Sequence, residues 1–160
     1  MLGDSDFWEG EYSDRDSQIH EPFDWFFDFA DLDQTLWATL LGPTRSRIMV
    51  LGCGHSSMSA DMVDRGGWAN VTSVDSSETV IQLMRAKRPD LEWLVGDARD
   101  LTGLPDGAGA DGRYDVVVDK GLLDALLSYR GDMTAGDSAA REAARLLKPG
   151  GISRGAGGVR

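Results

Sequence analysis

Glycines and aspartates lie where three segments that we expect to be strands end. Gly52 and Gly54 follow the segment 47–51, Asp75 closes the segment 70–75, and Asp97 follows the segment 91–95. Glycines allow a positive φ and let a ligand approach the backbone closely. A carboxylate about 20 residues further on can accept hydrogen bonds from both hydroxyls of a ribose. A second carboxylate can accept from the exocyclic amine of adenine, so this pattern predicts an adenosine site.

Each of these residues also has a simpler interpretation. Two glycines alone suit a tight turn, and Asp75 could cap the following helix, although Ser76 and Ser77 could do so instead. Asp97 alone would be an ordinary turn residue. The third glycine of a dinucleotide fingerprint would fall at Ser57, so the loop does not favour a pyrophosphate.

A charged pair follows the fourth such segment. Asp119 and Lys120 come directly after three valines, where we expect the chain to leave the sheet and face the reactive end of a bound nucleoside. They are the candidate catalytic residues. The alternative is a solvated pair in a loop, the usual place of adjacent charges.

The elements that position these residues alternate along the chain. Short segments rich in apolar and β-branched residues predict strands at 47–52, 70–75, 91–97 and 114–121. Helix-like spacing predicts helices at 34–41, 56–67, 76–89, 122–127 and 138–151. Such alternation is typical of an α/β fold with a Rossmann-like, doubly wound, mostly parallel sheet flanked by helices. Ligands of these sheets bind outside the carboxyl ends of the strands.

The length, charge and cysteine content of the chain limit the kinds of partner and the cellular location that we expect. The chain has 160 residues and a net charge of −11, which suits one domain and disfavours nucleic acid while attracting basic segments. The single cysteine, Cys53, permits no internal disulfide. No signal peptide and no membrane-spanning run is evident, and no metal site is expected. We therefore expect a cytoplasmic protein.

Six motifs occur in a familiar order: FWEGEY, FDWF, VLGCGHS, VTSVDSS, GDARDL and VVDKGLLDALL. Together they cover most of residues 7–151 and resemble the class I S-adenosylmethionine-dependent methyltransferases. More narrowly, they resemble the group that includes the lysine methyltransferases of elongation factor 1-alpha. VVDKGLLDALL is the most specific of the six motifs and GCG the least.

The resemblance implies S-adenosyl-L-methionine as the cofactor and a protein lysine as the methyl acceptor. It implies that residues 1–30 form a lid over the cofactor. The cofactor contacts that it implies are Trp8, Tyr12, Trp25, Gly52, Gly54, Asp75, Ser76, Asp97, Ala98 and Lys120. A lysine nucleophile must be neutral, so burial in an apolar channel would have to lower its pKa from near 10.4.

The end of the chain departs from the family pattern. Residues 152–160 are poor in strand formers, so we expect a methyltransferase domain over 1–151 and a disordered tail over 152–160. The sheet would then lack the last strands of the class and have an open edge beside the fourth strand. Two alternatives stay open: a catalytically incomplete cofactor-binding remnant and a small-molecule methyltransferase. A dehydrogenase is disfavoured by Ser57, and the oligomeric state is not fixed by the sequence.

Overall fold

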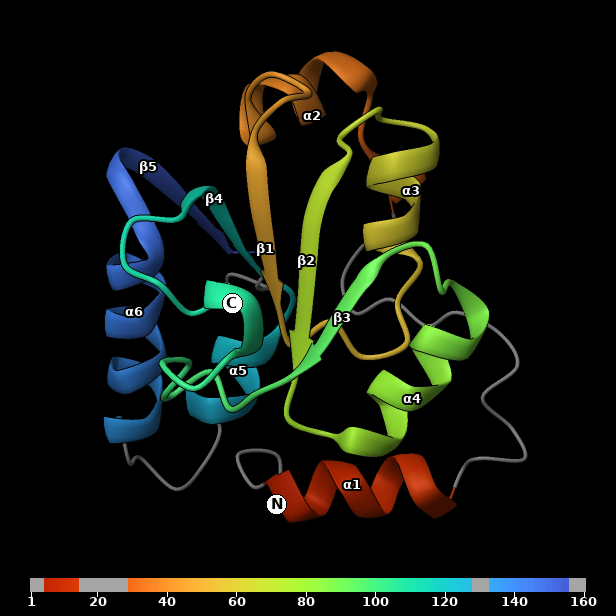
Figure 1. The fold of residues 1–160 in the computed structure, drawn as a ribbon, viewed down its shortest axis with the longest axis vertical. Helices are drawn as coiled ribbons and strands as arrows, with labels where there is room; N and C mark the ends of the chain where they lie inside the picture. Colours follow the sequence, from red (N-terminus) through yellow and green to blue (C-terminus); the bar gives the residue numbers. More distant parts are fainter. Residues whose placement is uncertain (1–4, 15–28, 128–132, 156–160) are drawn as a thin grey trace.

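A computed structural model describes residues 5–14, 29–127 and 133–155. Its centre is a five-stranded sheet of order β3-β2-β1-β4-β5, in which every strand pair is parallel (Figure 1). The strands are β1 (Arg47–Leu51), β2 (Asn70–Asp75), β3 (Glu92–Val95), β4 (Tyr114–Asp119) and β5 (Leu147–Gly155). The order reverses at β1, between β2 and β4, as expected for a doubly wound sheet.

Helices connect most of the strands, and a loop with one short 3₁₀ turn connects β3 to β4. The helices are α1 (Ser5–Asp14), α2 (Gln34–Leu41), α3 (Met58–Asp64), α4 (Glu78–Lys87), α5 (Leu122–Leu127) and α6 (Thr134–Leu146), with short 3₁₀ turns η1 (Phe29–Asp31) and η2 (Pro105–Gly107). The sequence predicted α2 and α5 with the observed bounds. The side chain of Asp33 caps α2 by accepting from the Leu36 N–H at 2.9 Å, and Gly42 ends it with φ +72°.

Two apolar layers cover the sheet, because successive side chains of a strand point to opposite faces. Ile48 and Val50 pack into the core beneath α2, α3 and α4, whereas Met49 and Leu51 pack into the core beneath α5 and α6. The central strands β1 and β4 contain runs of buried apolar residues, Ile48–Leu51 and Val116–Val118, because both of their faces are covered.

The fifth strand corrects the prediction of a disordered tail from residue 152. Val116, Val117 and Val118 of β4 pair with Ile152, Ser153 and Arg154, so β4 has a neighbour on each side. The Arg154 guanidinium also donates to the Leu40 carbonyl at 3.3 Å. Residues 156–160 lie outside the described residues.

None of the helices in the described ranges has both the length and the apolar character required to cross a bilayer.

Candidate functional site

Four strands present their carboxyl ends side by side, and backbone hydrogen bonds hold these ends in register. The Gly96 N–H donates to the Asp75 carbonyl at 2.9 Å, which joins the end of β3 to that of β2. The Cys53 N–H donates to the Val74 carbonyl, and the Lys120 N–H donates to that of Leu51, each at 3.1 Å. The loops that follow β1, β2, β3 and β4, where sequence analysis placed the candidate site residues, therefore lie together at one edge of the sheet.

The loop after β1 requires its glycines. Gly52 and Gly54 have φ values of +66° and +51°, which L side chains rarely adopt. A Cβ at Gly52 would lie 2.8 Å from the Leu122 Cβ, and one at Gly54 would lie 3.0 Å from the Tyr12 hydroxyl. The bare backbone of this loop is thus a cradle that side chains would fill.

Asp75 is buried at the end of β2, with 9% of its surface exposed. Its Oδ2 accepts from the Gly54 N–H at 2.9 Å and its Oδ1 accepts from the Ser77 N–H at 3.0 Å. Burial raises the pKa of this carboxyl, and the backbone N–H groups of Ser77, Gly54 and Ser76 partly oppose the rise. The hydroxyl of Ser77 caps α4 through the Val80 N–H at 3.2 Å, so Asp75 is not needed for that task. Ser76, between them, is partly exposed.

Asp97 and Ala98 follow β3 together. Ala98 is buried, whereas Asp97 is partly exposed and forms an ion pair with Arg99, whose backbone N–H and Nε each donate to it at 2.9 Å. The Arg99 guanidinium holds the pKa of Asp97 below its usual range.

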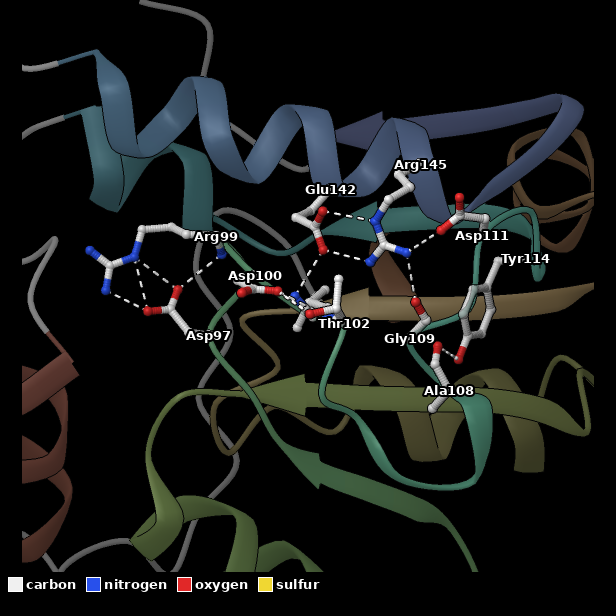
Figure 2. A network of polar contacts seen from close by, with 11 residues as sticks. Asp97, Arg99, Asp100, Thr102, Ala108, Gly109, Asp111, Tyr114, Glu142 and Arg145 are labelled. Atoms are coloured by element: carbon white, nitrogen blue, oxygen red, sulfur yellow. Dashed lines mark hydrogen bonds and ion pairs between the residues drawn. The ribbon is translucent and has the colours of Figure 1, made fainter.

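Asp97 belongs to the loop between β3 and β4, and a polar network attaches this loop to helix α6 (Figure 2). Glu142 of α6 accepts from the Leu101 N–H at 2.8 Å. Arg145, one turn on, bonds Glu142 at 2.6 Å and 2.9 Å and donates to the Gly109 carbonyl at 2.7 Å. The loop is therefore held at both of its ends, at Leu101 and at Gly109.

Asp119 and Lys120 are buried, with 6% and 4% of their surfaces exposed, so they are not a solvated pair. Asp119 Oδ1 accepts from the N–H groups of Leu122 and Leu123 at 2.8 Å and 3.1 Å, and thereby caps α5. Burial raises the pKa of Asp119.

Helix α1 lies across the carboxyl ends of the strands, beside the start of α4 (Figure 1). The Tyr12 ring meets the His55 ring edge to face at 5.9 Å, and the Trp8 ring lies 6.0 Å from that of Tyr12. Two of the three predicted aromatic contacts, Trp8 and Tyr12, are therefore on an element at this edge. Trp25 lies outside the described residues.

Sequence reasoning missed Glu9. Its carboxylate accepts from the Ser77 hydroxyl at 2.6 Å and also from the Thr79 hydroxyl. These hydrogen bonds lower the pKa of Glu9, with the Ser77 bond the largest cause. The available signal was the hydroxyl-rich start of α4, because helix N-termini attract carboxylates. Nothing in the sequence indicated which carboxylate would dock there.

A cavity of about 410 Å³ lies at the opposite edge, beside the amino ends of β1 and β4. Its one acid, Asp115, is already bonded to the Arg47 N–H at 2.8 Å and to Lys148 at 2.7 Å. The cavity thus offers no uncommitted carboxylate. Among the described residues, no group of three or more His, Cys, Asp or Glu side chains could hold a metal.

The chemistry at the carboxyl edge fits an adenosine compound that carries positive charge. Acidic side chains from different elements gather there: Glu9, Asp75, Asp97 and Asp119. Of the nearby cations, Arg99 forms an ion pair with Asp97, and Lys120 is buried at the end of β4. A pyrophosphate would meet an acidic edge, whereas a sulfonium and an amine would be attracted to it.

A parallel sheet of this order, with a glycine cradle and carboxylates at its strand ends, defines a Rossmann-like domain for a nucleoside cofactor. The chain belongs to the methyltransferase domain family, whose model matches residues 48–151. S-adenosylmethionine is the cofactor that this class implies, and the residues present fit it.

The curated relatives are longer than this chain. EEF1A lysine methyltransferase 4 of Mus musculus is 36% identical over 156 residues, which cover 91% of this chain and 57% of the relative. The eEF1A lysine and N-terminal methyltransferase of the same species is 30% identical over 156 residues, covering 94% and 21%. The solved TehB-like SAM-dependent methyltransferase from Corynebacterium glutamicum shares the fold. It has a TM-score of 0.56 and 16% identity, and the match covers 93% of this chain and 70% of that chain.

Proposed function

We propose that this chain binds S-adenosylmethionine and serves a methyltransferase that modifies an amine of a protein, with a lysine of an elongation factor 1-alpha as the first candidate. The observation that carries the proposal is the buried Asp75 carboxylate beside the glycine cradle. The names of the curated relatives support the acceptor class.

Asp75 and Asp97 hold the nucleoside in this proposal. Each carboxylate oxygen has two lone pairs, so Asp75 keeps capacity for the two ribose hydroxyls while it accepts from Gly54 and Ser77. Asp97 accepts from the adenine amine, and the buried Ala98 supplies an apolar contact. Gly52 gives the methionine part access to the backbone.

The bound cofactor supplies a methyl group activated by a positive sulfonium. The protein's task is to bring a neutral amine into line with that methyl group, at about 3–3.5 Å. Asp119 holds the first turn of α5 beside this point, and Lys120 fixes the end of β4 to β1 through its backbone. Their contribution is therefore positional.

The protein substrate follows from charge as well as from relatives. A net charge of −11 attracts a basic segment and repels nucleic acid. One relative is named for both lysine and N-terminal methylation, so the α-amine of a protein is a second acceptor. A cytoplasmic location is part of the proposal and rests on the sequence alone.

Methyl transfer from labelled cofactor tests the proposal. We expect purified elongation factor 1-alpha to become labelled, and mass spectrometry to place the methyl group on a lysine. Label at the N-terminus would move the acceptor to the α-amine. Labelled small molecules in a cell extract would support a small-molecule methyltransferase. Cofactor binding without transfer to any acceptor would support a cofactor-binding module.

A further inference from the structure

Glu9 joins helix α1 to the first turn of α4. Its Oε2 accepts from the Ser77 hydroxyl at 2.6 Å and from the Thr79 N–H at 3.4 Å, while its Oε1 accepts from the Thr79 hydroxyl. Both oxygens of one carboxylate are thus committed to a helix end almost 70 residues away in sequence. The N-terminal dipole of α4 adds to the attraction.

Ser77 connects this contact to the cofactor carboxylate. Its backbone N–H donates to Asp75 at 3.0 Å, while its hydroxyl donates to Glu9. One residue therefore bonds both acids, and the position of α1 is coupled through it to the end of β2.

A second contact of α1 lies one turn further along the helix. The Tyr12 ring packs against His55. The Tyr12 hydroxyl lies next to Gly54, only 3.0 Å from where a Cβ on that residue would be. Gly54 in turn donates to Asp75. Helix α1 thus contacts the residues on both sides of the Asp75 carboxylate.

We infer that Glu9 is a positioning residue of the cofactor site, which fastens α1 across Asp75 and thereby slows the release of bound cofactor. The inference rests on the proposed function. Glu9 acts through Ser77 and Thr79, and its removal frees α1 while leaving Asp75 and the glycine loop in place.

The test compares Glu9→Gln with Glu78→Gln. Both changes remove one negative charge at the start of α4, but the exposed Glu78 side chain bonds only Gln82, at 3.1 Å, in the described contacts. We expect S-adenosylmethionine to leave Glu9→Gln about tenfold faster in stopped-flow displacement, the size of one lost charge-assisted hydrogen bond. The rate for Glu78→Gln should equal that of the wild type.

A double-mutant cycle with Thr79→Val assigns the effect to this contact. Thr79→Val should also speed release, and the double variant should be no faster than Glu9→Gln alone. In the cofactor-free protein, hydrogen exchange of the α1 amides should rise in Glu9→Gln and not in Glu78→Gln.

Three results overturn the inference. The first is an unchanged release rate in Glu9→Gln, even if its melting temperature falls, because Glu9 would then serve folding only. The second is an equal change in Glu78→Gln, which would indicate charge alone. The third is strict additivity in the cycle. Wild-type protein that binds no cofactor overturns the proposed function instead, and α1 exchange then still reports whether Glu9 docks the helix.

Discussion

Asp75 supports the local structure of the edge at which the cofactor is proposed to bind, although the cap of α4 is Ser77 and not Asp75. Its carboxylate accepts from the N–H groups of Ser77 and Gly54, so it stabilises two turns of the protein itself. It is also buried at the strand end where a ribose would bind. The role in local structure therefore positions the carboxylate for the role in binding.

Replacing Asp75 by Ala should weaken S-adenosylmethionine binding by at least about 100-fold, because two charge-assisted hydrogen bonds to the ribose are lost. Isothermal titration calorimetry measures the affinity. Asp137→Ala is the matched control, since it removes the same charge from an exposed position in the first turn of α6. Unchanged affinity in Asp75→Ala would contradict the site assignment.

The affinity should also depend on pH in a direction set by Asp75. Its folded pKa is raised above the ordinary value of 3.8 by burial, so its stabilising contribution to folding is present below 3.8 and is lost as pH rises through the folded pKa. Cofactor binding needs the ionised form. Affinity should therefore fall as pH decreases, at a pH above 3.8. The neighbouring Asp97 and Glu9 have lowered pKa values and stay ionised in this window.

Calorimetry at several pH values checks this expectation. A Glu9→Gln variant should lower the midpoint, because the negative charge of Glu9 is one of the causes that raise the pKa of Asp75. A midpoint that rises in Glu9→Gln would contradict the assignment of the titration to Asp75.

The residues that sequence reasoning found are those whose position follows from local pattern. Gly52, Asp75 and Asp97 lie at the ends of segments that local pattern predicts to be strands, and parallel strands bring their carboxyl ends together at one edge of the sheet. The docking of Glu9 on Ser77 spans 68 residues, and no local pattern specifies such a pair.

Among the elements, β5 was missed for a comparable reason. Its residues after Leu147 include three glycines and a proline, which local propensity disfavours in a strand. The open edge of β4 offers backbone partners that outweigh this propensity, and Arg154 adds its bond to Leu40. Tertiary pairing thus made a strand of residues that were expected to end a helix (147–151) or to form a tail (152–155).

The loop between β3 and β4 is a second element whose position depends on contacts that are distant in sequence. Composition predicted an irregular loop rich in Gly, Pro and Asp, and the structure ties it to α6 through Glu142 and Arg145 (Figure 2). These bonds span 41 and 36 residues. An element with little regular structure can therefore still hold Asp97 in a fixed place.

Glu142→Ala should lower the free energy of unfolding by about 1–3 kcal/mol, because the buried Leu101 N–H loses its acceptor and Arg145 loses its main partner. Denaturant unfolding measures the change. Asp111→Ala removes the second acidic partner of Arg145. Because the Asp111 side chain is 81% exposed, this change should cost less than about 0.5 kcal/mol. Equal costs would show that the network does not anchor the loop through Glu142.

At the scale of the whole molecule, the two edges of the sheet differ in chemistry. The carboxyl edge collects the glycine cradle, the acidic side chains and α1 (Figure 1), whereas at the amino edge Asp115 pairs with Lys148 and accepts from the Arg47 backbone N–H. This chain supplies the four strand ends that would hold the cofactor, although it spans 57% of its mouse relative. Cofactor binding can therefore be measured on this chain without a methyl acceptor.

The binding should appear in the stability of the entire domain. Free cofactor at 100 times its Kd stabilises the folded state by about 2.7 kcal/mol. For a domain of roughly 150 residues, this raises the melting temperature by about 5–10 °C. Differential scanning fluorimetry should show the shift in the wild type and Asp137→Ala, and not in Asp75→Ala. NAD should give no shift, since its pyrophosphate would meet the acidic edge and Ser57 replaces the third glycine of a dinucleotide loop. A shift with NAD and none with S-adenosylmethionine would reverse the choice of cofactor while leaving the fold unchanged.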